Sequence, residues 1–385
     1  MTPVLVSGVI ANKYLNGGAV WTRLNWILGL KRLGFDVYFV EQIAREACID
    51  AAGAIAPFEE SENLSYFKAI SGQFGLDDKS SLIYDDGAQV HGLQLDEIEE
   101  VADSAAFLVN ISGHLALDRV RRRVRCSVYV DLDPGFTQFW HASGNLGARL
   151  ANHEHYYTVG ENIGRDGCAI PVSGIDWRPI CQPVVLDEWP VSVEGARDRF
   201  TTIASWRGAF GPVEHGGKTF GVKVHEFRKF LGMPDRLPAS FEIALDIHEA
   251  DSHDRQTLAD HRWTLTDPKV AVPNPDAFRR YVQASGAEFS VAQGIYTETN
   301  SGWFSDRTVR YLASGKPALV QDTGFSRNYP VGEGLLPFRT LDEAVSGAER
   351  VLHDYDEHCT AARRLAEEYF DSNIVLGRLV NEIDV

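Results

Sequence analysis

Apolar and polar positions along the first 40 residues follow the order strand, loop, helix and strand. An apolar run covers residues 4–10, and residues 19–33 carry apolar side chains at the spacing of one helix face. Gly34 can end this helix in the left-handed conformation, and a second β-rich run begins at Asp36. The pattern predicts a βαβ unit at the start of the chain.

The same alternation predicts the remainder of an α/β lobe. Strand-like runs recur at residues 106–111, 127–132, 156–159 and 170–172. The first two runs end in the turn sequences Ser112-Gly113-His114 and Asp133-Pro134-Gly135. Because ligands of open parallel sheets gather at the carboxyl ends of the strands, we expect these polar groups to face a ligand site.

A second lobe begins after a proline-containing segment. Three prolines interrupt residues 179–190, and the strand pattern restarts at residues 200–206, which places a domain boundary near residue 187. Further strand-like runs are expected at 241–247, 278–284, 289–292 and 317–321, and helices at 342–353 and 357–369. The fold class predicted is α/β with two Rossmann-like lobes, residues 1–186 and 187–370, and a tail, residues 371–385, that packs across the lobes.

Composition narrows the class of protein. A length of 385 residues suits two domains, and 44% hydrophobic residues suit a globular chain. The net charge of −17 disfavours a nucleic-acid partner. The five cysteines are dispersed and odd in number, which argues against a disulfide framework. With no leader pattern and no long apolar run, we expect a cytoplasmic protein without an integral membrane segment.

The most informative stretch is a helix with polar entry in the second half. Ser305 is placed as its N-cap, Asp306 follows near the positive end of the helix dipole, and Gly315 ends it. The N–H groups of such an end suit a diphosphate, and Arg307 and Arg310 add positive charge. An ordinary capped helix with its arginines in solvent would show the same pattern.

The entry Ser301-Gly302-Trp303-Phe304-Ser305, followed by a helix and Gly315-Lys316-Pro317, resembles the donor-binding helix of GT-B glycosyltransferases of the family 1 and 4 type. The resemblance implies two Rossmann-like lobes facing a cleft, with Gly302, Trp303 and Ser305 at the nucleotide diphosphate. It also implies metal-independent transfer from a nucleotide-sugar donor to a small-molecule or glycan acceptor, with no cofactor besides this co-substrate. Where many members have a ribose-binding glutamate this chain has Arg310, so Asp306, Glu298 or other groups would hold the nucleotide.

The resemblance assigns three further groups of residues. The glycine-rich stretch 205–218 looks like the first donor-side loop, although a surface hairpin would have the same composition. The pair before the first helix resembles the N-terminal glycine loop, and the turn after strand 317–321 corresponds to the sugar side. The residues are Arg207, His215 and Lys218 in the donor loop, Gly17 and Gly18 in the glycine loop, and Asp322, Thr323 and Gly324 on the sugar side.

An inverting transfer needs a base for the acceptor hydroxyl, and His114 and Asp133 are the candidates. His114 ranks first because an imidazole accepts a proton near neutral pH without a large pKa shift, although both residues could simply stabilise turns. His153-Glu154-His155 offers no third ligand, so no metal is expected. A nucleotide-sugar epimerase and a non-catalytic sugar-nucleotide-binding protein remain alternatives, whereas the dinucleotide fingerprint of an oxidoreductase is missing.

Overall fold

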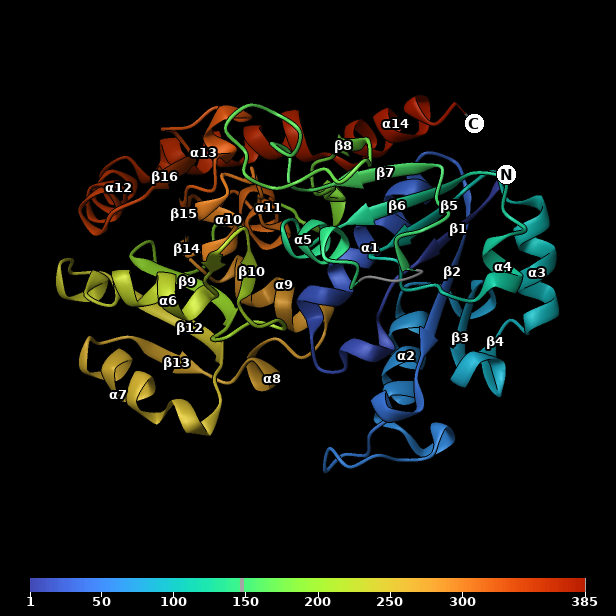
Figure 1. The fold of residues 1–385 in the computed structure, drawn as a ribbon. Coiled ribbons are helices and arrows are strands. Elements are labelled where there is room, and N and C mark those ends of the chain that lie inside the picture. The colour runs from blue at the N-terminus through green and yellow to red at the C-terminus, as the bar shows by residue number, and fades with distance from the viewer. Residues whose placement is uncertain (146–148, 385) are drawn as a thin grey trace.

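The computed structural model describes residues 1–145 and 149–384. Two parallel sheets flanked by helices stand side by side, one from each half of the chain (Figure 1). The prediction of two Rossmann-like α/β lobes is therefore confirmed.

The first sheet has eight strands and is parallel except for the pair β3 and β4. In spatial order the strands are β4 (Gln89–Gly92), β3 (Ser80–Tyr84), β2 (Asp36–Ile43), β1 (Pro3–Ser7), β5 (Leu108–Ile111), β6 (Ser127–Asp131), β7 (His155–Thr158) and β8 (Trp177–Pro179). The chain reverses its direction of travel across the sheet between β1 and β5. In doubly wound sheets this switch point is where ligands bind.

The second sheet has six strands, all parallel. Their spatial order is β13 (Thr264–Thr266), β12 (Ser240–Asp246), β9 (Arg199–Ser205), β14 (Ala287–Ser290), β15 (Ala318–Gln321) and β16 (Leu335–Phe338). Its switch point lies between β9 and β14. A separate hairpin follows β9 and consists of β10 (Val213–His215) and β11 (Lys218–Phe220).

Helices connect the strands of both sheets (Figure 1). In the first lobe they are α1 (Gly17–Arg32), α2 (Glu62–Gln73), α3 (Leu95–Ser104), α4 (Asp118–Arg121) and α5 (Phe136–Ala142). In the second lobe they are α6 (Lys223–Phe227), α7 (Ser252–Asp260), α8 (Pro268–Ala271), α9 (Pro275–Gln283), α10 (Gly294–Glu298), α11 (Asp306–Ala313), α12 (Leu341–His353) and α13 (Tyr355–Leu365). The last helix, α14 (Ser372–Glu382), returns to the first lobe.

Two strand predictions are wrong. Residues 278–283 belong to α9, and Ala284 is its C-cap. Phe278 and Val282 are four apart on one helix face, and Asn274 caps the helix by accepting from the Ala277 amide at 2.9 Å. Residues 170–172 form no strand, and the edge strand β8 follows instead. Pro171 has no N–H for a sheet hydrogen bond, which disfavours a strand there.

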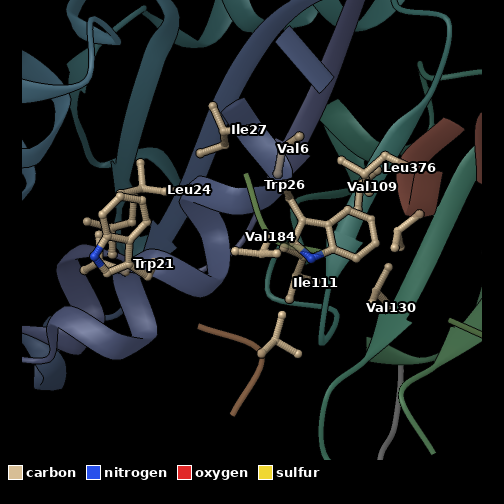
Figure 2. Packing of buried hydrophobic residues seen from close by; sticks show 14 of the residues in the cluster. Val6, Trp21, Leu24, Trp26, Ile27, Val109, Ile111, Val130, Val184 and Leu376 are labelled. Carbon is tan, nitrogen blue, oxygen red and sulfur yellow. The ribbon is translucent and has the colours of Figure 1, made fainter. Parts of the chain in front are cut away.

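The largest hydrophobic core is shared by both lobes. Trp26 of α1 is fully buried beneath the first sheet, among Val6, Val109, Ile111, Val130 and, from α14, Leu376 (Figure 2). The same cluster continues into Phe278 and Val309 of the second lobe. A buried tryptophan of this kind contributes on the order of 3–5 kcal/mol to folding.

The first and last helices join the lobes. The amide of Gly17 donates to the Val272 carbonyl at 3.0 Å, and the Trp21 indole donates to the Pro275 carbonyl at 2.8 Å. At the other end of the chain, Tyr157 of the first sheet donates to the Glu382 carboxylate at 2.8 Å. Contacts at both termini of the sequence thus fix how the two lobes sit against each other.

Candidate active site

The loop after β1 begins the site and is shaped by one buried carboxylate. Glu41 of β2 accepts hydrogen bonds from the amides of Ile10, Ala11 and Asn12 at 2.7, 2.8 and 2.8 Å. Burial raises the pKa of Glu41 to about 7, although these bonds and Arg23 favour its ionised form. The tethered loop carries Lys13, whose side chain is exposed.

Arg23 of α1 extends over the end of β1. A Cβ atom on Gly8 would lie 2.9 Å from the Arg23 Cγ atom, so glycine leaves the room that this side chain occupies. The guanidinium lies close enough to Lys13 and Asp133 to change the pKa of both. These groups meet at the switch point of the first sheet.

His114 follows β5 through a strained turn. Ser112 and Gly113 both have positive φ, at 54° and 65°, and a Cβ atom on Gly113 would lie 2.6 Å from the Arg149 carbonyl oxygen. Burial, and then the charges of Arg23, Arg149 and Lys13, lower the pKa of His114 to about 3. His114 ranks first as the base only if its pKa stays near the ordinary value of an imidazole. The pKa of about 3 does not meet this condition.

Asp133 and Asp131 sit two residues apart but differ in their contacts. The Asp131 carboxylate accepts from Thr137, Gln138 and Thr158 at 2.6, 2.8 and 2.7 Å. No described residue donates a hydrogen bond to the half-buried Asp133 carboxylate. Burial and the neighbouring Asp131 raise the pKa of Asp133 to about 6, against the opposing effect of Arg23. Asp133 therefore has free lone pairs and a pKa close to neutral, as a general base requires.

The glycine pair that begins α1 lies in the contact between the lobes. A Cβ atom on Gly17 would lie 2.2 Å from the Asn274 carbonyl oxygen, and one on Gly18 would lie 2.7 Å from the Phe278 ring. The Gly17 amide is already bonded to Val272. Glycine is needed here because the second lobe approaches the helix backbone so closely.

In the second lobe, the N-terminus of α11 abuts α1. Ser305 caps the helix by accepting from the Arg307 amide at 3.2 Å, as its sequence predicts. The Asp306 carboxylate accepts from Thr22 at 2.5 Å and from Arg310 at 2.7 Å. Arg310 is almost fully buried and lies over the Phe278 ring. Asp306 and Arg310 therefore form an ion pair at the junction of the lobes.

Arg307 turns inward at the switch point of the second sheet. Its guanidinium donates to Glu288 at 2.6 Å, to the Ile203 carbonyl at 2.8 Å and to Ser290 at 2.6 Å. Glu288 is fully buried, so this ion pair is internal. The side chain thus links the carboxyl ends of β9 and β14.

Lys223 at the start of α6 is a functional candidate that the sequence analysis missed. Its ammonium donates to the Val291 carbonyl at 2.5 Å, just beyond β14. Burial, and then the charge of Arg307, lower the pKa of Lys223 to about 7. The signal that could have revealed it is Gly221, which precedes a lysine at a helix N-terminus directly after the glycine-rich loop.

The three residues assigned to the donor loop are engaged by other side chains. Arg207 pairs with Asp251, and Lys218 pairs with Glu298 at 3.0 Å. His215 packs against Phe139 of the first lobe with ring centroids 4.8 Å apart. A cavity of about 400 Å³ opens beside this loop, lined by Arg207, Phe210, Gly211, Pro212, Val222, Val224, His225, Arg228 and Asp251.

The remaining motif residues hold the second lobe against Asn162 of the first. Gly302 donates to the Thr323 carbonyl at 2.8 Å, and a Cβ atom on it would lie 2.7 Å from the Asn162 side chain. Trp303 stacks on Tyr296 at a centroid distance of 4.5 Å.

The turn assigned to the sugar side is stabilised internally. Asp322 accepts from the Gly324 amide and from Arg339, both at 2.8 Å, and Thr323 donates to the Trp303 carbonyl at 2.5 Å. Asn162 also donates to the Gly324 carbonyl at 3.1 Å. The turn therefore forms part of the contact between the lobes.

His153, Glu154 and His155 do not gather as metal ligands. His153 contacts the Leu150 carbonyl and the Asn110 amide, at 3.2 and 3.1 Å, while Glu154 accepts from the Ser127 amide at 2.7 Å. In residues 1–145 and 149–384, no three His, Cys, Asp or Glu side chains are grouped to hold a metal ion.

Comparison with solved structures reveals the same architecture in other proteins. The chain is similar over its full length to an α-glucosyltransferase in complex with UDP and a 13-mer DNA, with 10% identity, coverage of 99% of that chain and a TM-score of 0.61. It is also similar to Anabaena HepE in complex with UDP and glucose, with 12% identity, full coverage of both chains and a TM-score of 0.60. The fold is that of GT-B glycosyltransferases.

A third GT-B structure, sucrose-phosphate synthase from Thermosynechococcus elongatus, has 10% identity, coverage of 100% of this chain and 99% of that chain, and a TM-score of 0.54. No protein-family model and no curated protein matches the sequence. At identities of 10–12%, what the chain shares with these enzymes is the GT-B fold. None of the helices in the described part of the chain is long and apolar enough to cross a bilayer.

Proposed function

We propose that this GT-B chain transfers a sugar from a nucleotide-diphosphate donor to a small-molecule or glycan acceptor. The observation that carries the proposal is the approach of the two lobes at this site, where Thr22 of α1 donates to the Asp306 carboxylate of α11 at 2.5 Å. Asp133 of the first lobe lies within electrostatic reach of Asp306, at the N-terminus of α11 in the second lobe. A transfer reaction requires such a meeting, because a donor held by one lobe must contact an acceptor activated by the other.

The donor diphosphate is placed at the second switch point. Lys223 carries an ammonium there, and Arg307 adds positive charge behind it. Two of the structures of similar fold described above contain UDP, which agrees with a nucleotide diphosphate as ligand. Ser305, Gly302 and Trp303 shape the entry to α11, and the pair of Asp306 with Arg310 supports it.

Asp133 is the preferred base for an inverting reaction. Its carboxylate has no hydrogen-bond donor among the described residues, and its pKa of about 6 leaves it mostly ionised at neutral pH. His114, with a pKa of about 3, is a weak proton acceptor and is assigned to orienting the acceptor as a neutral imidazole.

We further propose that transfer needs no metal ion and no cofactor and takes place in the cytoplasm. Lys223 and the N-terminus of α11 supply positive charge for the leaving diphosphate. Structures of an α-glucosyltransferase of similar fold hold DNA, but the net charge of −17 in this chain favours an acceptor other than nucleic acid.

Incubation with a panel of nucleotide sugars and candidate alcohol acceptors tests the proposal. The expected result is release of a nucleoside diphosphate and gain of one sugar by an acceptor, detected by mass spectrometry in the presence of a metal chelator. Asp133→Asn should abolish transfer, whereas Asp176→Asn, at a side chain with 91% exposure, should not.

Other outcomes separate the alternatives. An epimerised sugar with no glycosylated acceptor would identify an epimerase. Tight donor binding with no product from any pairing would identify a non-catalytic binding protein. Loss of transfer in the chelator, restored by a divalent cation, would overturn metal independence.

A further inference from the structure

Arg23 is a buried cation whose charge has no direct partner. The residue is 7% exposed, and its hydrogen bond runs from Nη1 to the Ala19 carbonyl of its own helix at 3.2 Å. Within the described chain its Nε atom has no acceptor, and no carboxylate pairs with the guanidinium. An unpaired buried guanidinium is costly and is normally compensated by an anion.

Two of the three carboxylates that act on Arg23 are hydrogen-bonded to other groups. Glu41 is bonded to three backbone amides, and Asp306 is bonded to Thr22 and Arg310. Asp133 acts on Arg23 at a distance, without a hydrogen bond. The local positive charge is therefore only partly offset.

Two further cations surround the same point. Lys13 sits on the loop that Glu41 tethers, and Arg149 lies beside the turn that carries His114. Loss of hydration, and then the charge of Arg23, lower the pKa of Lys13. Lys13, Arg23 and Arg149 together act on His114, so this imidazole remains neutral and keeps one N–H to donate. In a chain with a net charge of −17, three cations around one imidazole are a local exception.

We infer that Lys13, Arg23 and His114 bind an anionic group, a phosphate or a carboxylate, that belongs to the acceptor. This assignment rests on the proposed transferase function. Lys13 and His114 follow β1 and β5 in the chain, and the Arg23 side chain of α1 lies over Gly8, just after β1. The charges of Lys13 and Arg23 act on Asp133, beside which we place the acceptor hydroxyl. The donor diphosphate, by contrast, is assigned to Lys223 on the second lobe.

Inorganic phosphate is the first probe. In the wild-type protein, millimolar phosphate should raise Tm by about 2 °C or more once its concentration is well above Kd. Lys13→Met and Arg23→Met should lose this shift, and Arg23→Lys should retain part of it. Lys68→Met, which removes an exposed lysine from α2, is the matched control and should behave as wild type.

UDP is the second probe and separates acceptor from donor. Because the anion site is distinct from Lys223, the affinity for UDP measured by calorimetry should change less than about twofold in Lys13→Met and Arg23→Lys. Phosphate should still raise the Tm of the wild-type protein saturated with UDP. A tenfold or larger loss of UDP affinity, or abolition of the phosphate shift by UDP, would overturn the acceptor assignment and move the site to the donor.

Paired acceptors complete the test. Among alcohols that differ only by a phosphate or carboxylate, the wild type should favour the anionic member at least tenfold in kcat/KM, and Lys13→Met should remove the preference. Equal rates for both members in the wild type would contradict the inference. A different result would separate the two hypotheses. If phosphate raises Tm in a manner that depends on Arg23, but the protein binds no nucleoside diphosphate, then the anion site is supported and the transferase function is refuted.

Discussion

Thr22 of α1 donates a hydrogen bond of 2.5 Å to the Asp306 carboxylate, the first residue of α11. The two residues are 284 positions apart in sequence, and they belong to different lobes. Arg310 binds the same carboxylate oxygen from within the second lobe. The geometry of the candidate active site therefore depends directly on how the lobes are joined.

Thr22→Val tests this contact with almost no change in volume. We expect the free energy of unfolding to fall by about 1–2 kcal/mol, because a charge-assisted hydrogen bond in a nearly buried setting is lost. Denaturant unfolding measures the change. The Thr22 hydroxyl lies 3.1 Å from the Gly18 carbonyl of its own helix as well. The control is Thr257→Val in α7, where the hydroxyl donates to the His253 carbonyl of its own helix and contacts no described residue of the other lobe. Equal effects of the two substitutions would argue against the contact between lobes.

Asp133→Asn and Asp131→Asn should change stability in opposite directions at pH 7. The folded-state pKa of Asp133, about 6, exceeds its ordinary value of 3.8, so its ionisation disfavours the folded state. This destabilisation develops as the pH rises from about 4 to 6, and Asp133→Asn should therefore raise the free energy of unfolding by at most about 3 kcal/mol. Burial raises the pKa of Asp131 as well. Asp131→Asn should nevertheless lower the free energy of unfolding, because Asp131 accepts from three side chains and an amide offers only one acceptor oxygen. Thermal unfolding between pH 4 and 8 distinguishes the two.

The pH dependence of transfer tests the role of Asp133 as base. The rate should rise with pH through about 6 as Asp133 loses its proton, and His114 should contribute no step between pH 5 and 9 because its pKa is about 3. Steady-state kcat/KM profiles of the wild type and of His114→Gln provide the measurement. Disappearance of the limb near pH 6 in His114→Gln would transfer the role to the imidazole.

Lys223→Met should weaken UDP binding by about tenfold to a hundredfold, the effect of losing one desolvated charge-assisted contact. The matched control is Lys218→Met, since the Lys218 ammonium is half exposed and pairs with Glu298. Because the pKa of free Lys223 is about 7, UDP affinity should also decline above this pH in the wild type. Calorimetry at pH 6 and pH 8 gives both results, and a larger loss in Lys218→Met would favour the donor loop instead.

Arg307→Met should destabilise the fold by about 3–5 kcal/mol, because Glu288 would be left buried without its cation. The double variant Arg307→Met/Glu288→Gln should recover a large part of this loss, as a thermodynamic cycle would show. Additive losses would contradict a coupled pair.

Local sequence pattern was sufficient for much of the fold. The apolar spacing of residues 19–33 predicted α1, and Ser305 with Gly315 predicted the limits of α11 to within a residue or two. The pattern was insufficient for residues 278–284, where apolar residues four apart in a short run were taken for a strand. The strand β13 has three residues, which are too few to show a period in the sequence, and it is stabilised by its pairing with β12.

The sequence by itself determined the alternation of strands and helices in much of both lobes, the two-lobed fold and the turns that present His114 and Asp133, because these depend on periodicity and turn chemistry over a few neighbouring residues. The tertiary structure decided which charges are free. Arg307 is paired with Glu288, Asp306 is bound by Thr22 and Arg310, and Asp131 accepts from three donors. Among the described residues, no oppositely charged side chain pairs directly with Asp133, Lys223 or Arg23. Whether a charged side chain is paired depends on partners far away in sequence and on burial, and neither is encoded in local spacing.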